Sequence, residues 1–328
     1  MTYALPRHSL FGQVTACLAI AAWALASVAH AQVFPSRPIT MVVPVAAGSG
    51  SDVIARAVAN DASALLKQPI VIDNRPGAGG NIGTALVARA KPDGYTLVMN
   101  SLNHVINPAL YSKPGYDVAS DFVPVVILGT GNIVLAVRGD SPIKDLKSFL
   151  EAARKASAPL TYATPGNGSV NHLATAMLAQ AAGVKFQHIP FGGAPAASNA
   201  LAAGQVDFAI LAPASTTGMF QSGRLRALGM TGPRIASMPG VPSIREILPD
   251  YEAAPWYGVF APKGTPPDVV AKLHHAFKEA QSRPELKNRM EQVGIVLGSQ
   301  SQEDFAKLMT TEIPRWNEVV KRSGATVD

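Results

Sequence analysis

The alternation of strand-like and helix-like patterns constrains the fold of this chain more than any other feature. β-branched runs at 39–43, 70–72 and 95–99 flank stretches whose apolar residues recur at helical spacing, such as 53–65. The alternation restarts later, with helical patterns at 146–156, 170–178, 194–203 and 214–222 and strand patterns at 160–163, 186–189, 206–211 and 256–260. This order is typical of α/β layers around a largely parallel sheet. We therefore expect an α/β fold.

Two similar turns suggest that the α/β pattern forms two lobes. The segments GSGSDVIA at 48–55 and GNGSVNHLA at 166–174 both place G-x-G-S between a strand and a helix. The similarity is too short to establish a repeat. We expect lobe 1 to contain residues 32–137 and 255–328 and lobe 2 to contain residues 138–254, so that lobe 1 is discontinuous.

Residues 1–31 have the pattern of a signal peptide. A weakly basic start precedes an apolar run, and Ala29-His30-Ala31 gives the A-x-A pattern of signal-peptidase cleavage before Gln32. The segment ending in Cys17 resembles a lipoprotein processing site, but most of the apolar run follows it, so a lipid anchor is disfavoured. We therefore predict an exported protein.

Composition argues against several classes of function. Cys17 is the only cysteine, so the mature chain would have no thiol for catalysis, disulfides or metal ligation. The 28 basic and 22 acidic residues give a formal net charge of +6, without the basic stripe of a nucleic-acid-binding protein. No apolar stretch after the signal segment approaches the length of a membrane helix. We predict no nucleic-acid partner and no membrane span.

The turn PVAAGSGSD at 44–52 has the chemistry of an anion site without a cationic side chain. The first N–H groups of a helix lack internal partners and carry partial positive charge. Glycine allows a ligand to approach the backbone, so peptide N–H groups and the hydroxyls of Ser49 and Ser51 could bind an anion. Alternatively, the glycines only make a tight turn and Ser51 only caps the helix.

The sequence lacks the specific motifs of common catalytic and cofactor-binding sites. The segment GAGGNIG at 77–83 lacks the last glycine of a dinucleotide fingerprint, because position 82 is Ile82. The sequence contains no P-loop, no G-x-S-x-G elbow and no H-E-x-x-H motif. His274 and His275 are adjacent on a helical pattern, so they point about 100° apart and cannot share a metal. We predict no cofactor, no metal and no catalytic residue, although a triad assembled in space remains possible.

Two polar residues in the turns have open roles. Asp52 adds negative charge beside the first turn, where it could complement the helix dipole, position the loop or meet a ligand ammonium group. His172 lies about one turn into the helix after the second glycine turn. It could donate to a bound anion, or it could pack and cap locally.

Several longer segments resemble the solute receptors of tripartite tricarboxylate transporters, also called Bug receptors. They include FPSRPITMVVPVAAGSGSDVIAR, IVIDNRPGAGGNIGT, KPDGYTLVM, GNGSVNHLA, LAAGQVDFA and WYGVFAPKGTP, in the family's order. The resemblance implies a type II periplasmic binding protein, with a central β-sheet flanked by helices in each lobe and a ligand cleft at the hinge. It also implies a periplasmic monomer that captures a small organic carboxylate and delivers it to a membrane permease.

The resemblance also implies ligand contacts on both lobes, made largely by backbone groups and ordered water. In lobe 1 the matching positions are Ala46, Ala47, Gly48, Ser49, Gly50, Ser101 and Asn103. In lobe 2 they are Thr164, Asn167, Gly168, Ser169 and His172, with Phe191, Gly193 and Ala212 as candidates for the far wall.

Two departures from the family's pattern bear on the ligand. Relatives often have a basic residue where this chain has Gly192, and they tend to be more polar at 211–214. We therefore expect room for an aromatic or longer aliphatic carboxylate. A ligand-sensing subunit of a membrane signalling protein and an exported hydrolase remain as alternative functions.

Overall fold

The computed structural model describes residues 34–235, 237–251, 253–292 and 294–323. Residues 1–36 and 37–328 form separate units, and all features below belong to the second unit. The predicted signal peptide and Cys17 lie outside the described residues.

The first sheet has six strands, and it contains both the first and the last strand of the described residues. Its order is β11-β4-β10-β3-β1-β2, and β1 pairs in parallel with β2 and β3, whereas β10 and β11 run antiparallel to β4. The strands are β1 (Ile39–Val43), β2 (Ile70–Asn74), β3 (Thr96–Ser101), β4 (Phe122–Gly131), β10 (Trp256–Pro262) and β11 (Ile295–Leu297).

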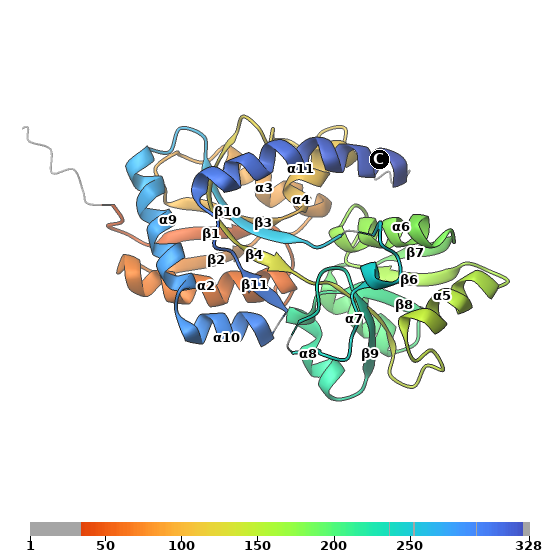
Figure 1. The fold of residues 1–328 in the computed structure, drawn as a ribbon. Coiled ribbons are helices and arrows are strands. Elements are labelled where there is room, and N and C mark those ends of the chain that lie inside the picture. The colour runs from red at the N-terminus through yellow and green to blue at the C-terminus, as the bar shows by residue number, and fades with distance from the viewer. Residues whose placement is uncertain (1–33, 236, 252, 293, 324–328) are drawn as a thin grey trace, which may run out of the picture. The chain divides into compact units, whose positions relative to one another are not determined.

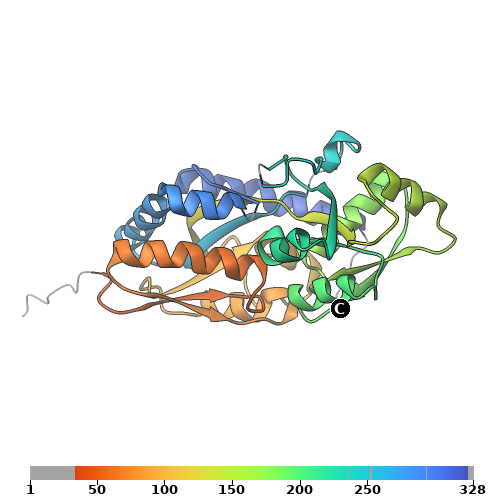
Figure 2. The ribbon, with the colours of Figure 1, turned by 90° about the horizontal axis from the view of Figure 1, so that it is seen from below.

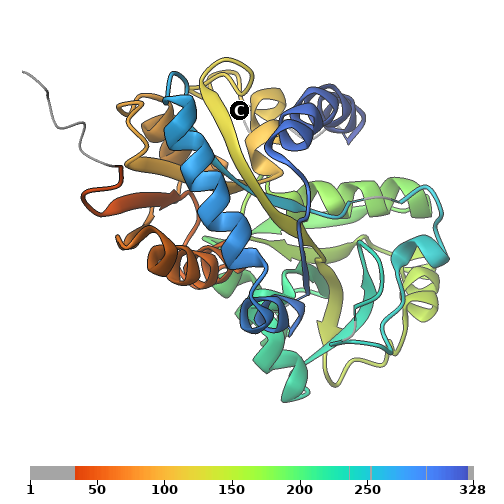
Figure 3. The ribbon, with the colours of Figure 1, turned by 60° about the vertical axis from the view of Figure 1, so that its left-hand side comes forward.

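Helices on the faces of this sheet bury its apolar side chains. They are α2 (Gly50–Leu66), α3 (Asn81–Ala88), α4 (Asn103–Leu110), α9 (Pro267–Gln281), α10 (Pro284–Gln292) and α11 (Gln302–Ser323), with a short turn η1 (Ala78–Gly80). Helices α9 and α10 pack against α2 (Figure 2), and α9 also contacts β4 (Figure 3). On the apolar face of α11, the buried Trp316 and Trp256 of β10 both donate to one oxygen of Glu312.

The second sheet has five strands in the order β7-β6-β8-β5-β9 (Figure 1). Its strands are β5 (Val134–Arg138), β6 (Leu160–Thr164), β7 (Phe186–Pro190), β8 (Phe208–Leu211) and β9 (Leu225–Met230). Its helices are α5 (Leu146–Lys155), α6 (Val170–Ala182), α7 (Ala194–Ala202) and α8 (Pro213–Gln221), with a short turn η2 (Ile244–Glu246). The α/β fold of two sheets flanked by helices is confirmed.

The sheets are more mixed than the sequence pattern predicts. Strands β6, β7 and β8 are parallel, but β5 runs antiparallel to both of its neighbours. Strands β5 and β10, which enter a sheet after the chain has crossed from the other sheet, run antiparallel to their neighbours, as does the short strand β11 beside β4. Alternation within each βαβ unit could not reveal them, because each crossing strand has no partner beside it in sequence.

Asn132 joins the two segments that cross between the sheets. It lies between β4 and β5, and its side chain accepts from the N–H of Gly232 at 2.7 Å and donates to the carbonyl of Pro233 at 3.0 Å. Beside it, Ile133 and Thr231 exchange two hydrogen bonds. Asn132 is only 2% exposed, so its amide is a buried hydrogen-bonded contact between the two segments that connect the sheets. The lobe limits expected from the sequence stay a prediction.

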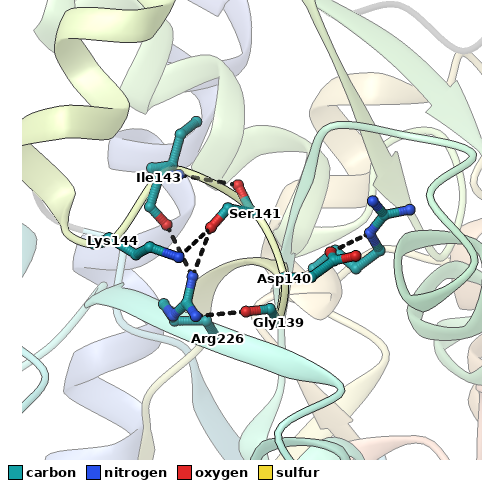
Figure 4. A network of polar contacts seen from close by, with 7 residues as sticks. Gly139, Asp140, Ser141, Ile143, Lys144 and Arg226 are labelled. Carbon is teal, nitrogen blue, oxygen red and sulfur yellow. Dashed lines mark hydrogen bonds and ion pairs between the residues drawn. The ribbon is translucent and has the colours of Figure 1, made fainter.

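Arg226 of β9 fixes the turn that follows β5. Its guanidinium donates to the carbonyl oxygens of Gly139, Ser141 and Ile143, and Lys144 donates to Ser141 as well (Figure 4). Because the guanidinium satisfies backbone carbonyls and no carboxylate, its role in the described contacts is to hold the β5–α5 connection.

Candidate functional site

The first glycine turn joins β1 to α2 in a fixed conformation. Gly48 has φ of +78°, and its N–H donates to Oδ2 of Asp52 at 2.9 Å. Ser49 occupies the N-cap position of α2, but its side chain makes no capping hydrogen bond. The first N–H groups of α2 therefore have neither intrahelical partners nor a serine cap.

Asp52 holds this turn to the sheet. Besides the Gly48 N–H, its carboxylate accepts from Arg56 at 3.0 Å and from Asn74 at 2.9 Å, and Asn74 also donates to the carbonyl of Val45. Burial alone would raise the pKa of Asp52, but the hydrogen bonds from Arg56, Gly48 and Asn74 outweigh burial and leave the pKa below its ordinary value. Of the roles left open by the sequence, positioning of the loop fits these contacts.

The second glycine turn joins β6 to α6 in the same way. Gly168 has φ of +69°, and its N–H donates to Nδ1 of His172 at 3.1 Å. Ser169 is the N-cap of α6, and its hydroxyl accepts from the N–H of His172 and donates to the carbonyl of Gly166. Here the serine does cap its helix.

The geometry aligns the two turns two residues away from the G-x-G-S alignment of the sequence. Gly48 corresponds to Gly168, because each is a left-handed glycine followed by an N-cap serine. In both turns the residue four positions after that glycine accepts its N–H. The shared unit is therefore Gly-Ser-x-x followed by a hydrogen-bond acceptor, which is Asp52 in one turn and His172 in the other.

Both turns border a cavity of about 680 Å³. Nine of the residues carried over from the family resemblance line it: Ala46, Ser49, Gly50, Ser101, Asn103, Asn167, Ser169, Gly193 and Ala212. Six others are outside the lining: Ala47, Gly48, Thr164, Gly168, His172 and Phe191. The last of these, Phe191, packs against the apolar cluster that contains Ala163 and Leu201.

The cavity has further walls outside the contact positions that the resemblance gave, although the sequence had already singled out Ser51 as an anion donor and Gly192 as a source of room. They include the loop after β2, the crossing segments and residues next to the glycine turns: Pro44, Val45, Ser51, Pro76, Gly77, Ala78, Gly79, Gly80, Tyr111, Ile133, Pro165, Gly166, Val170, Asn171, Pro190, Gly192, Ala194, Pro255 and Tyr257. A signal existed for 76–80, because this loop follows β2 at the same sheet edge at which the first turn follows β1. Tyr111, Ile133 and Tyr257 carry no comparable local signal.

The wall of the cavity contains no charged side chain among its lining residues. Its positive potential comes from helix starts instead, since Gly50, Asn103, Val170 and Ala194 are the first residues of α2, α4, α6 and α7 and all line it. The partial positive charge at a helix N-terminus favours anions. Such a wall suits a carboxylate held by uncharged donors.

Asn103 connects the second glycine turn to the other side of the cavity. Its side-chain NH₂ donates to the carbonyl of Gly168 at 3.2 Å and to Asn107 at 3.4 Å. Asn107 in turn donates to the carbonyl of Gly79 at 3.0 Å and to Asn81 at 2.7 Å. A chain of amides therefore runs from the second turn to the loop after β2.

His172 lies behind the second turn in an aromatic stack. Its ring is parallel to that of His188, with centroids 4.0 Å apart, and Nε2 of His188 lies 2.6 Å from the hydroxyl of Thr164. Burial lowers the pKa of His172, and burial together with the charge of His172 lowers that of His188 to about 4. Both rings are therefore neutral at neutral pH.

The described residues also bear on other kinds of site. Among them, no group of three or more His, Cys, Asp or Glu side chains is placed to hold a metal ion. Within the same residues, no helix has both the length and the apolar character needed to cross a membrane.

Two α/β sheets joined by crossing segments, with a cavity between facing helix starts, define a periplasmic binding protein fold. The chain belongs to the family described as the tripartite tricarboxylate transporter family receptor, whose model matches residues 54–325. Proteins of this family, which include the Bug receptors, are periplasmic solute-binding proteins that bind small carboxylates and work with transporter permeases.

Relatives agree over most of their length. The UPF0065 protein of the tcbD-tcbE intergenic region of Pseudomonas sp. (strain P51) is 40% identical over 290 residues, which cover 88% of this chain and 86% of that protein. Protein BugT of Bordetella pertussis (strain Tohama I) is 32% identical over 310 residues, covering 93% of this chain and 95% of BugT.

Solved structures agree with the fold and include carboxylate complexes. The periplasmic binding protein BugD is 34% identical, with a TM-score of 0.84 over 89% of this chain and 99% of BugD. Rpa4515 of R. palustris with adipate is 31% identical, with a TM-score of 0.84 over 89% and 99% of the two chains. MatC of Rhodopseudomonas palustris with bound malate is 34% identical, with a TM-score of 0.81 over 88% and 100%.

Proposed function

We propose that this chain captures an organic carboxylate with an aromatic or longer aliphatic body and delivers it, unchanged, to a tripartite tricarboxylate-type permease. The observation that carries the proposal is the uncapped start of α2 on a cavity whose lining has no charged side chain. The family membership supports the carboxylate class, and relatives in complex with adipate and malate give its size range.

One carboxylate group would bind at the start of α2. Ser49 is 7% exposed and lines the cavity beside Gly50 and Ser51, and its hydroxyl is not used as a helix cap. Charge-assisted hydrogen bonds contribute roughly 1.5–3 kcal/mol each. Three or four of them would give roughly 5–12 kcal/mol before ordering and desolvation costs, a range that includes the about −8.2 kcal/mol of micromolar binding.

The rest of the ligand would face the second sheet and the crossing segments. Asn167 and Ser169 offer polar groups there, whereas Ile133, Pro255 and Ala212 are apolar. Gly192 leaves open space, because a Cβ atom at this position would meet nothing within 4 Å. The combination favours a long or aromatic body over a short hydroxy acid such as malate.

The predicted signal peptide at 1–31, a periplasmic location, a monomeric state and the limits of the two lobes belong to the same proposal. So do the six predicted contact residues outside the cavity lining, which would act by shaping the turns. Contact with both turns would favour the state in which they face each other, because a ligand shifts an equilibrium only through differential affinity.

The test is a thermal-shift screen of the mature protein against mono-, di- and tricarboxylates, followed by calorimetry. A ligand at about 100 times its dissociation constant should add roughly 2.7 kcal/mol to the free energy of unfolding. We expect adipate or an aromatic carboxylate to give the largest shift and to be recovered unchanged. Tightest binding to malate would contradict the proposed size class, and no shift with any carboxylate would contradict the function.

A further inference from the structure

His172 and Asn103 bind the two backbone groups of Gly168 in the second turn. Its Nδ1 accepts the N–H of Gly168 at 3.1 Å, while the carbonyl of Gly168 accepts from Asn103 across the cavity at 3.2 Å. His172 itself does not line the cavity. Its contacts are therefore those of a residue that orients the turn.

The hydrogen bond from Gly168 fixes the protonation state of His172. A backbone N–H can only donate, so Nδ1 must be unprotonated and the ring proton must be on Nε2. Protonation of Nδ1 would place two N–H donors face to face at a distance that now holds a hydrogen bond. The turn would have to move away, and with it the carbonyl that Asn103 reaches.

No neighbouring group compensates for the charge of a protonated His172 in the described contacts. The titratable rings on it are His188 of β7, whose own protonation would oppose that of His172, and Tyr162 of β6 at 6.3 Å. Helix α6 also packs against β8, which has no titratable residue, and against α11. The charged residues of α11 are Glu303, Asp304, Lys307, Glu312, Arg315, Glu318, Lys321 and Arg322.

Three of the four acids on α11 have partners of their own, and Asp304 pairs with Ser301. Glu312 accepts from Trp256, Trp316 and Arg315, and Glu318 is paired with Arg322. Asp207, just before β8, accepts from the N–H and hydroxyl of Thr161. The nearest ionisable group to His172 is thus a second histidine.

We propose that His172 is a positioning residue whose neutral ring holds the second turn in its binding conformation and whose protonation weakens ligand binding. The inference rests on the proposed function, because it assigns an acid-sensitive step to the same site. The equivalent position of the first turn holds Asp52, whose carboxylate accepts the N–H of Gly48. The pKa of Asp52 lies below its ordinary value, so this carboxylate stays ionised over the pH range in which a histidine titrates. Only the second turn is therefore built to respond to acid.

The proposal predicts the sign of the pH effect. The folded-state pKa of His172 lies below its ordinary value of 6.5. The hydrogen bond from Gly168 is therefore intact at pH 6.5 and above, and it is lost as the pH falls through the lowered folded-state pKa. An imidazolium in direct contact with the carboxylate would do the opposite and strengthen binding in acid. The direction of the change separates the two roles.

The binding experiment uses adipate as the probe and calorimetry at about pH 7.5 and about pH 5.5. We expect wild-type affinity to fall between these conditions by no more than about tenfold, because the pKa of His172 lies below 6.5 and this ring is protonated in only part of the molecules at about pH 5.5. In His172→Asn the amide oxygen can accept from Gly168 without titrating, so the ratio of the two affinities should fall to near that expected from adipate protonation alone. His188→Asn is the matched control and should keep most of the dependence. Adipate protonation affects every variant equally and cancels in the comparison.

A ligand-free measurement keeps the inference testable if adipate does not bind. In ¹H–¹⁵N NMR spectra, the Gly168 amide should shift with the same midpoint as the His172 ring in the wild type, and His172→Asn should abolish this transition. Failure of every carboxylate to bind would contradict the proposed function but leave this result to decide the role of His172. A Gly168 amide that ignores the His172 titration, tighter adipate binding in acid, or an undiminished pH dependence in His172→Asn would overturn the proposal.

Discussion

Adjacent glycines on the cavity wall differ in what a side chain would cost. Gly193 has φ of +121°, and a Cβ atom there would lie 3.2 Å from the Cβ of Ala46 in the first turn. Gly192 has neither constraint, since its φ lies outside the left-handed region and the space beside it is open. At the scale of single residues, Gly193 is needed for its backbone conformation and for the close approach of its loop to the first turn. Gly192 instead sets the room available to a ligand.

Replacing Gly192 with leucine should therefore reduce binding without unfolding the protein. We expect Gly192→Leu to weaken adipate binding at least about tenfold, because the side chain enters the cavity. Calorimetry measures the affinity, and thermal unfolding checks the fold. Gly240→Leu is the control, since Gly240 is likewise exposed and unconstrained but does not line the cavity. Equal affinities for the two variants would argue against this wall as part of the site.

At the scale of elements, the two helices that follow the glycine turns are capped differently. Ser169 caps α6 with its hydroxyl, while Ser49 leaves α2 uncapped and Asp52 instead ties the preceding glycine to the helix. A helix start buried without a cap costs stability unless another group meets its N–H donors. In the proposed function, a bound anion would meet the N–H donors at the start of α2, while the hydrogen bonds of Asp52 hold the turn in place.

Removing the Asp52 carboxylate should destabilise the protein. Asp52→Ala leaves the donors of Gly48 and Asn74 without their acceptor, so we expect a loss of about 2–4 kcal/mol in the free energy of unfolding, measured by denaturant titration. Asp52→Asn keeps one acceptor oxygen and should lose less. If the two variants were equally stable, the hydrogen bonds would not explain the role of Asp52.

At the scale of the whole molecule, the two sheets are connected by two chain segments, and the side chain of Asn132 in one segment binds the backbone of the other. Its amide spans about one hundred residues of sequence to reach Gly232 and Pro233. Any change in the relation of the two sheets must pass through these segments, because they are the covalent connections between the sheets. A buried amide at this point stabilises the pair of segments as one unit.

Asn132→Ala tests how much these two hydrogen bonds contribute to stability. We expect it to lower the free energy of unfolding by about 1–3 kcal/mol, since the buried N–H of Gly232 loses its partner. Hydrogen exchange should also accelerate at Gly232 and Thr231. Asn199→Ala on the exposed surface of α7 is the control and should change stability by no more than about 0.5 kcal/mol. An Asn132→Ala variant as stable as this control would show that the joint does not depend on the amide.

Local patterns in the sequence determined the α/β class, most of the helices and the two glycine turns. Strand, glycine and helix start follow one another within about ten residues in each turn, so periodicity and turn chemistry are sufficient to detect them. The family resemblance added fifteen contact positions, of which nine line the cavity. Each of these features depends on neighbours in sequence.

Only the tertiary structure decided how the donors of the turns are used. The alignment of Gly48 with Gly168 depends on backbone dihedral angles, and the N–H groups of both glycines are taken by Asp52 and His172. The antiparallel strands, the position of Phe191 in the core and the cavity contacts of Tyr111 and Tyr257 likewise arise from segments distant in sequence. Because a hydrogen bond satisfied within a turn is no longer available to a ligand, the sequence indicated an anion site, and three-dimensional contacts determined which groups remain to form it.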